Sequence, residues 1–187
     1  VDYNIISESI GQESFISILE GLNGQPLFDI LADGRYVIID NYNDRRIHIY
    51  DSTSGNLVTE QTSNYYYYLT IDDNDIYVSD GSNGIFKLDI SDIENGVISR
   101  ELEIDLQALS LNLNGYQFSA ENETILFNTN SNGTNQTWIR EGASGSPVLL
   151  TTNTNNDCCL KPMLVDGDIY QFETWWFKKY NLDTGEY

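Results

Sequence analysis

Basic residues are scarce in this sequence. Only 9 of its 187 residues are Lys or Arg, against 29 Asp or Glu, and the formal net charge is −20. A field of that sign repels nucleic-acid phosphates and anionic lipid headgroups, so we expect no nucleic-acid partner. The same acidity suits divalent cations, basic partners or a salty exterior, and it is also an ordinary means of keeping a domain soluble.

Long apolar runs are missing as well. The uninterrupted apolar runs are only a few residues long, far short of the ~20 needed to cross a bilayer. A signal peptide is not visible, because Val1 is followed at once by Asp2 and a polar, strand-like segment without a basic start. We therefore expect no membrane insertion and interpret the chain as a mature or excised piece.

Cysteine and histidine are almost absent. Cys158 and Cys159 are adjacent, so they cannot cross-link distant segments, and a ring between neighbours is strained and readily reduced. We expect two free thiols, with a vicinal disulfide or a soft-metal site as alternatives; ligands for zinc are too few. The single histidine, His48, lies between two isoleucines, and no G-x-S-x-G nucleophile elbow accompanies it. We therefore predict that His48 is an ordinary strand residue.

Residues that suit pleated sheets are plentiful. The chain is 40% hydrophobic and 12% aromatic, with 13 Tyr. Aromatic side chains favour half-buried sheet surfaces, and this hydrophobic content is enough to fill a core. The composition therefore predicts an ordered, all-β domain.

A turn followed by a strand recurs four times along the chain. The copies begin at Asp33, Asn74, Glu123 and Asp166, and each is followed by a polar turn and another strand, predicted at 46–51, 85–89, 137–141 and 177–181. From Tyr50 to Tyr180, three intervals span 130 residues, or about 43 each. This period is typical of a four-stranded repeat rather than of leucine-rich or helical repeats.

Two further strands complete each repeat. We predict inner strands at 27–31, 67–71, 116–119 and 162–165, and outer strands at 57–60, 97–100 and 148–151. Leu102, Ile104 and Leu106 alternate with polar residues, and so do Leu109, Leu111 and Leu113, so strand structure is expected there too. Asn-Gly and Asp-Gly pairs between strands favour tight hairpins and a meander. One such sheet buries little by itself, so neighbouring sheets must stack.

The repeats resemble the β-propeller superfamily, with blades similar to the NHL, PQQ-type and TolB-like kinds. The resemblance covers about residues 27–187 and rests on the D-G-x-(I/Y)-(Y/V) strand and on hairpins such as Ile49 to Gly55 and Lys179 to Gly185. It implies four-stranded antiparallel blades and says little about function. The Trp-Asp dipeptide of WD repeats and the double glycine of Kelch repeats are absent.

The resemblance divides the chain into blades. Residues 1–26 would end a preceding blade, complete blades would occupy 27–64, 65–107 and 108–157, and 158–187 would form an incomplete blade. We favour a single domain or fragment of a larger ring of five to eight blades. The alternative is a closed four-blade ring in which the N-terminal strand completes the last blade.

Aromatic residues are the best candidates for a ligand site. We predict ligand binding at Trp175 and Trp176, at an expected hairpin tip, and at Tyr65 and Tyr66, because exposed aromatic faces stack on sugars or on protein partners. The competing interpretation, which also covers Trp138, is packing between blades.

Carboxylates and amides offer a weaker candidate for a metal site. Two acidic groups occur in sequence, Asp72, Asp73 and Asp75, and Asp40, Asp44 and Asp51. Such groups serve glycoside hydrolysis or hold Ca²⁺, but hairpin turns use the same residues. The stretch from Asn128 to Gly133 imitates a calcium loop with neutral ligands, and we predict a hairpin tip there instead. No cofactor is expected, with Ca²⁺ as the alternative.

Catalytic side chains are scarce, and this favours a binding module. We predict a non-catalytic propeller that serves as a binding or scaffold module for a protein or glycan, located in the periplasm, at the cell surface or in the secreted fraction. Three N-glycosylation sequons, at Asn122, Asn132 and Asn135, are explained by chance in a chain rich in Asn and Thr. The alternatives are a propeller-type lyase or hydrolase, a peptidase-associated propeller, and the structural subunit of a surface fibre.

Overall fold

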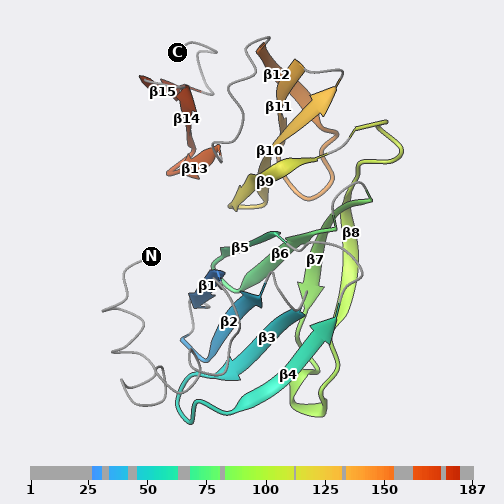
Figure 1. The fold of residues 1–187 in the computed structure, drawn as a ribbon, viewed down its shortest axis with the longest axis vertical. Coiled ribbons are helices and arrows are strands. Elements are labelled where there is room, and N and C mark those ends of the chain that lie inside the picture. The colour runs from blue at the N-terminus through green and yellow to red at the C-terminus, as the bar shows by residue number, and fades with distance from the viewer. Residues whose placement is uncertain are drawn as a thin grey trace. The chain divides into compact units, whose positions relative to one another are not determined.

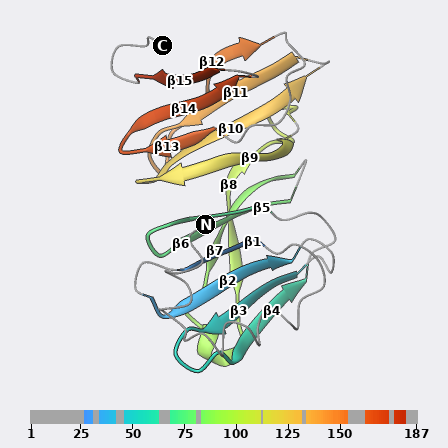
Figure 2. The same cartoon turned by 60° about the vertical axis from the view of Figure 1, so that its left-hand side comes forward.

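The computed structural model describes most of the chain after residue 26. The described residues are 27–30, 34–41, 46–62, 68–80, 83–111, 113–131, 134–153, 162–173 and 176–181. Within them the protein consists of fifteen strands in four antiparallel sheets and one short 3-10 helix (Figure 1, Figure 2). The predicted all-β fold of small antiparallel sheets is confirmed.

The chain divides into two compact units. The first unit holds residues 1–80 and 86–101, and the second holds 81–85 and 102–187. Each unit is therefore described by itself.

The first unit is built from two sheets of four strands. The first sheet has the order β1 (Leu27–Ile30), β2 (Tyr36–Asn41), β3 (Arg46–Asp51) and β4 (Leu57–Thr62). The second has the order β5 (Tyr68–Asp72), β6 (Asp75–Ser79), β7 (Gly84–Asp89) and β8 (Ser99–Asp105), with the helix η1 (Ile93–Asn95) between β7 and β8. The first residues of β7 and the last of β8 belong to the second unit.

The second unit holds the other two sheets. The third sheet has the order β9 (Leu113–Glu121), β10 (Thr124–Ser131), β11 (Thr134–Arg140) and β12 (Val148–Asn153), and the fourth has β13 (Met163–Val165), β14 (Asp168–Glu173) and β15 (Trp176–Tyr180). Neighbours in sequence are neighbours in every sheet, as a meander requires. No helix in the described part of the chain is both long enough and apolar enough to span a membrane.

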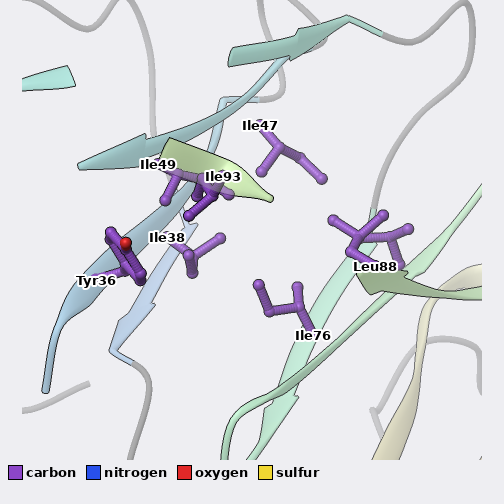
Figure 3. Close-up of a cluster of buried hydrophobic side chains, with 8 residues drawn as sticks. Tyr36, Ile38, Ile47, Ile49, Ile76, Leu88 and Ile93 are labelled. Atoms are coloured by element: carbon purple, nitrogen blue, oxygen red, sulfur yellow. The ribbon is translucent and has the colours of Figure 1, made fainter. Parts of the chain in front are cut away.

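The core of the first unit lies between its two sheets (Figure 3). Ile38, Ile47 and Ile49 of the first sheet and Ile76 and Val78 of the second are fully buried in one cluster. Alternate residues of a strand point to the same face, so the period-two pattern of the sequence places these side chains together. Burying each of them stabilises the fold by about 1.5–3 kcal/mol relative to exposure.

Tight turns join the strands as the Asp-Gly and Asn-rich spacing predicts. Asp166 and Gly167, between β13 and β14, both have positive φ, at 53° and 77°. The equivalent turn between β9 and β10 uses Asn122 and Glu123, at 49° and 62°. Two central residues with positive φ match the twist of the flanking strands. The second turn holds this geometry without glycine.

Matching bulges occur in two of the outer strands. Ile49 pairs with Thr59 and Tyr50 with Leu57, which leaves Val58 as the extra residue of β4. In β12, Leu150 is left over in the same way between its paired neighbours. Both extra residues pack against the apolar core of their own unit. The bulges therefore turn one apolar side chain of each outer strand inward.

One predicted strand is absent. The alternating leucines between β8 and β9 form a turn over residues 106–110, and only Leu113 begins a strand. The Leu109 N–H donates to the Asp105 carbonyl, and the Asp105 carboxylate accepts from the Ala108 N–H at 2.8 Å. The prediction of strand structure at 109–111 was wrong, because this local hydrogen bonding stabilises a turn that periodicity does not reveal.

Candidate binding site

The meander gives every sheet two different ends. Connections between first and second strands and between third and fourth strands lie at one end, which we call the turn end. Hairpins between second and third strands, and the links between sheets, leave from the opposite end, which we call the connector end. Because strand direction alternates in every sheet, the assignment of each loop follows directly from the strand order.

The turn end is acidic. Its described loops and their flanking strand residues contain Asp51, Asp73, Asp89, Asp92, Glu94, Glu121, Glu123, Glu141 and Asp166, and these loops contain no aromatic residue. The Arg35 guanidinium pairs with the Glu94 carboxylate there, joining the loop before β2 to η1.

Two of these carboxylates stabilise their own turns. The Asp51 carboxylate accepts hydrogen bonds from the Ser54 N–H at 2.7 Å and the Ser54 hydroxyl at 2.8 Å, and these bonds lower the pKa of Asp51. The Ser91 N–H, at 2.9 Å, lowers the pKa of Asp89 in the corresponding turn. Both carboxylates are thus committed to the turn geometry that follows the third strand of their sheet.

The four aromatic residues predicted to bind a ligand come from two separate segments of the sequence. Tyr65 and Tyr66 lie in the segment 63–67, between β4 and β5, and Trp175 lies between β14 and β15; all three are outside the described residues. Trp176 begins β15, where its backbone pairs with Glu173. The tyrosines belong to the first unit and the tryptophans to the second. The predicted ligand role of these residues stays a prediction.

Trp138 has a packing role inside the third sheet. Its ring stacks on Phe127, with centroids 6.4 Å apart, and its Nε1–H donates to the Thr129 hydroxyl at 3.0 Å. A buried indole needs a hydrogen-bond acceptor, and Thr129 supplies it. These contacts lie within one sheet, so the predicted packing between blades stays a prediction.

His48 is a strand residue with a carboxylate beside it. It lies on β3 opposite Glu60 of β4, with 3.7 Å between His48 Nδ1 and Glu60 Oε2. The other oxygen of Glu60 accepts from Arg46 at 2.9 Å, and the imidazole stacks on the Tyr50 ring. Sequence reasoning missed Glu60, although the register of two adjacent strands places it opposite the histidine.

A buried ion pair in the second unit also escaped the sequence analysis. The Arg140 guanidinium is 2% exposed and lies 2.7 Å from the Glu103 carboxylate, and it donates to the Ala143 carbonyl at 2.9 Å. The Glu103 carboxylate offsets the free-energy cost of burying the Arg140 guanidinium. The only signal in the sequence was an arginine that follows Trp138 and Ile139 at the end of a strand.

An Asp, Tyr and Lys group occurs in equivalent positions of the second and fourth sheets. Lys179 lies 2.5 Å from the Asp168 carboxylate and 5.8 Å from the centre of the Tyr170 ring, and the hydrogen bond that Lys179 donates to Asp168 raises the pKa of Lys179. In the second sheet, Lys87 lies 2.6 Å from Asp75 and 6.0 Å from the centre of the Tyr77 ring. The repeated ion pair gives the lysines a structural role.

The acidic groups singled out in the sequence are spread over different roles. Asp75 pairs with Lys87, Asp73 lies in a turn with φ of 52°, and Asp51 binds its own turn. Asp40 pairs through its backbone with Ile47, and Asp44 is outside the described residues. In the described part of the chain, no three His, Cys, Asp or Glu residues are grouped to hold a metal ion.

The remaining sequence candidates are placed as follows. Asn128 to Ser131 belongs to β10, which pairs with β11, so these residues are strand residues rather than a hairpin tip, and residues 132 and 133 lie outside the described residues. Cys158, Cys159 and the N-terminal segment 1–26 lie outside the described residues.

No protein-family model matches the sequence, and no curated protein matches it either. Solved structures do match. The chain is similar to "Dihydro-heme d1 dehydrogenase NirN in complex with DHE", with 16% identity and a TM-score of 0.54, over 88% of this chain and 35% of that one. It is similar to the Cps50 (Swd1) beta-propeller domain of Myceliophteria thermophila, with 16% identity and a TM-score of 0.52, over 84% and 48%.

A calcium-binding protein, regucalcin from Agrobacterium tumefaciens strain C58, is similar at 19% identity and a TM-score of 0.54, over 88% of this chain and 56% of that one. The chain thus spans between about a third and just over half of the length of these neighbours. At such identities the likeness shows the fold alone, and the neighbours are β-propellers with different functions. The protein therefore has the β-propeller fold, and its four sheets are blades of that fold.

Proposed function

We propose that this chain is a non-catalytic binding and scaffold module, placed outside the cytoplasm, that holds a protein or glycan partner at the connector end of its blades. The observation behind the proposal is the contrast between the two ends. Turn-end carboxylates such as Asp51 and Asp89 are bound within their own turns, whereas the segments that leave the connector end contain Tyr65, Tyr66 and Trp175.

The chemistry of that end suits stacking rather than catalysis. Tyr and Trp offer large rigid contact area and lose little conformational entropy on binding. Two groups of described side chains that could support acid or base chemistry already make contacts within the fold: His48 lies beside Glu60 in one sheet, and Arg140 forms a buried pair with Glu103. A partner with neutral or basic surface is favoured, because the chain carries a net charge of −20.

A location outside the cytoplasm is the second part of the proposal, and one of the three sequons lies in an exposed turn. Asn122 is exposed in the turn between β9 and β10, and Thr124 follows at the position that the sequon requires. Detection of the native protein in culture medium, periplasm or surface fractions tests this part of the proposal. Its recovery from the cytoplasm alone would contradict it.

The binding role is tested with two arrays, one of neutral oligosaccharides and one of basic peptides. We expect one array to give saturable binding, and we expect Tyr65→Ala with Tyr66→Ala, or Trp175→Ala, to weaken it by at least about tenfold, as loss of an aromatic contact does. Trp138→Phe is the matched control, because Trp138 packs inside its sheet. Binding that ignores the connector-end substitutions, or cleavage of the bound probe, would overturn the proposal.

A further inference from the structure

The three N-glycosylation sequons fall within residues 122–137, and the structure describes two of them in full. The remaining sequon begins at Asn132, and residues 132 and 133 lie outside the described residues. Composition explains how such triplets arise in this sequence. A folded chain, however, can carry a glycan only where the asparagine lies at the surface and a bulky group has room. The two described sequons differ in this respect.

The sequon at Asn122 forms the turn between β9 and β10. Asn122 and Glu123 are both exposed, with φ of 49° and 62°, and Thr124 is the first residue of β10. Glu121 pairs with Thr124 across the two strands, so Asn122 and Glu123 are the two central residues of a hairpin turn. Asn122 therefore lies at a tight, solvent-accessible turn.

The sequon at Asn135 lies inside a sheet. β11 has β10 on one side and β12 on the other, and Asn135 pairs with Asn130 and with Asn153. The Asn130 Nδ2 donates to the Asn135 Oδ1 at 2.9 Å, and Thr137, the last residue of the sequon, is 4% exposed. An enzyme could reach this sequon only in the unfolded chain. A glycan on Asn135 would then crowd Asn130 when the sheet forms.

Thr124 departs from the pattern of the repeat. The first residue of the second strand is Asp75 in the second sheet and Asp168 in the fourth, and each of them pairs with a lysine, at 2.6 Å and 2.5 Å. In the third sheet, Ile139 occupies the place of Lys179 in the strand register. The residue that completes the sequon thus stands at a position that two other sheets use for an ion pair.

The contacts around the turn leave the Asn122 amide available. The Glu121 carboxylate accepts from the N–H groups of Asp166 and Gly167, both at 2.9 Å, and these two residues are exposed. These bonds use the side chain of Glu121 and the backbone of the neighbouring turn, so a group attached to the Asn122 amide breaks neither of them. The turn is also at the opposite end of its sheet from the connector end, where partner binding is proposed.

We propose that Asn122 is an N-glycan attachment site of the folded protein and that Asn135 is not. The inference rests on the proposed location outside the cytoplasm, because N-glycans belong to the surface loops of secreted chains. The donor is an oligosaccharide carried on a lipid pyrophosphate. A bond forms between the Asn122 Nδ2 and the anomeric carbon of the sugar, the bond from that carbon to the pyrophosphate oxygen breaks, and one amide proton is released as the lipid pyrophosphate leaves.

The test is site mapping of the whole chain secreted from eukaryotic cells. Removal of N-glycans with a peptide glycanase in heavy-oxygen water converts each modified asparagine to a labelled aspartate, which peptide mass spectrometry locates. We expect the label at Asn122 and none at Asn135. Asn122→Asp and Thr124→Ala should abolish glycosylation of the turn, whereas Thr124→Ser should retain it because serine also completes the sequon.

Asn135→Gln is the matched control and should leave the labelling of Asn122 unchanged. Thermal unfolding of every variant verifies that it folds. Labelling of Asn135 as complete as that of Asn122, or a glycan that remains in the turn of Thr124→Ala, would overturn the inference.

The native protein provides the second arm of the test. Its surface, periplasmic or secreted fraction should yield the Asn122 peptide with a glycan attached. An unmodified Asn122 in such a fraction would contradict this inference and leave the proposed location intact. Recovery of the protein from the cytoplasm alone would instead contradict the proposed location, and the inference with it.

Discussion

The two units hold their pairs of sheets together in different ways. In the first unit, the buried contacts between the sheets are apolar, with isoleucines such as Ile38 and Ile76 fully buried between them, and the Arg35–Glu94 ion pair that joins the two sheets is exposed. In the second unit, an apolar cluster around Leu126 and Leu164 is accompanied by hydrogen bonds that the turn before β14 donates to β9. The Glu121 carboxylate accepts from the N–H groups of Asp166 and Gly167, both at 2.9 Å.

The difference shows that one repeat architecture accepts two kinds of contact between blades. Apolar burial depends on area and tolerates many combinations of side chains, whereas a carboxylate that binds two N–H groups fixes the position of the turn it contacts. A third backbone N–H group in this unit, that of Leu164, donates to the Ser119 hydroxyl at 3.2 Å. We therefore expect the first unit to be sensitive to cavities and the second to loss of acceptors.

The largest effect is expected from a cavity in the first unit. Ile38→Ala should lower the free energy of unfolding by about 3–4 kcal/mol, whereas Leu164→Ala in the second unit should lower it by about 2 kcal/mol, because Leu164 is less completely buried. Denaturant titration followed by circular dichroism measures both. An equal or larger loss for Leu164→Ala would remove the contrast between the units.

A smaller effect is expected from the carboxylate of the second unit. Glu121→Ala should lower the free energy of unfolding by about 1–2 kcal/mol, since two charge-assisted hydrogen bonds to an exposed turn are lost. Amide hydrogen exchange at Asp166 and Gly167 should accelerate. In Glu121→Gln, the exchange rates should lie between those of the wild type and those of Glu121→Ala.

Glu141→Ala is the control for this substitution, because it removes the same charge from an exposed position after β11. Its exchange rates at Asp166 and Gly167 should match those of the wild type. Equal acceleration in both variants would show that net charge, and not the contact with the turn, is responsible.

The smallest effect is expected on the pH dependence of the unfolding free energy. The folded pKa of Asp51 is lowered by Ser54, so its contribution to stability is complete above the unfolded pKa of about 4 and is lost as pH falls through the folded value. Asp51→Asn should reduce the difference in unfolding free energy between pH 7 and pH 3 by less than about 1 kcal/mol, since the group is largely solvated. An unchanged pH dependence in this variant would mean that the turn gains nothing from the charge.

Sequence reasoning reached the fold because the signals involved are local. Alternation of apolar residues located the strands, and Asp-Gly pairs located turns such as the one at Asp166 and Gly167. It failed between Leu109 and Leu111, where hydrogen bonds around Asp105 stabilise a turn in spite of the alternation. The predicted ligand residues Tyr65, Tyr66, Trp175 and Trp176 followed from composition and expected hairpin tips, and no described side-chain contact bears on them.

The amino-acid sequence by itself determined the strands, their order and the repeat, because these depend on neighbours a few residues apart. Only the tertiary structure decided that Glu103 would meet Arg140, that Glu121 would bind the turn at Asp166, and that Val58 and Leu150 would bulge inward. These contacts join residues from different strands or sheets, and their geometry depends on how the sheets twist and pack. No local pattern encodes it.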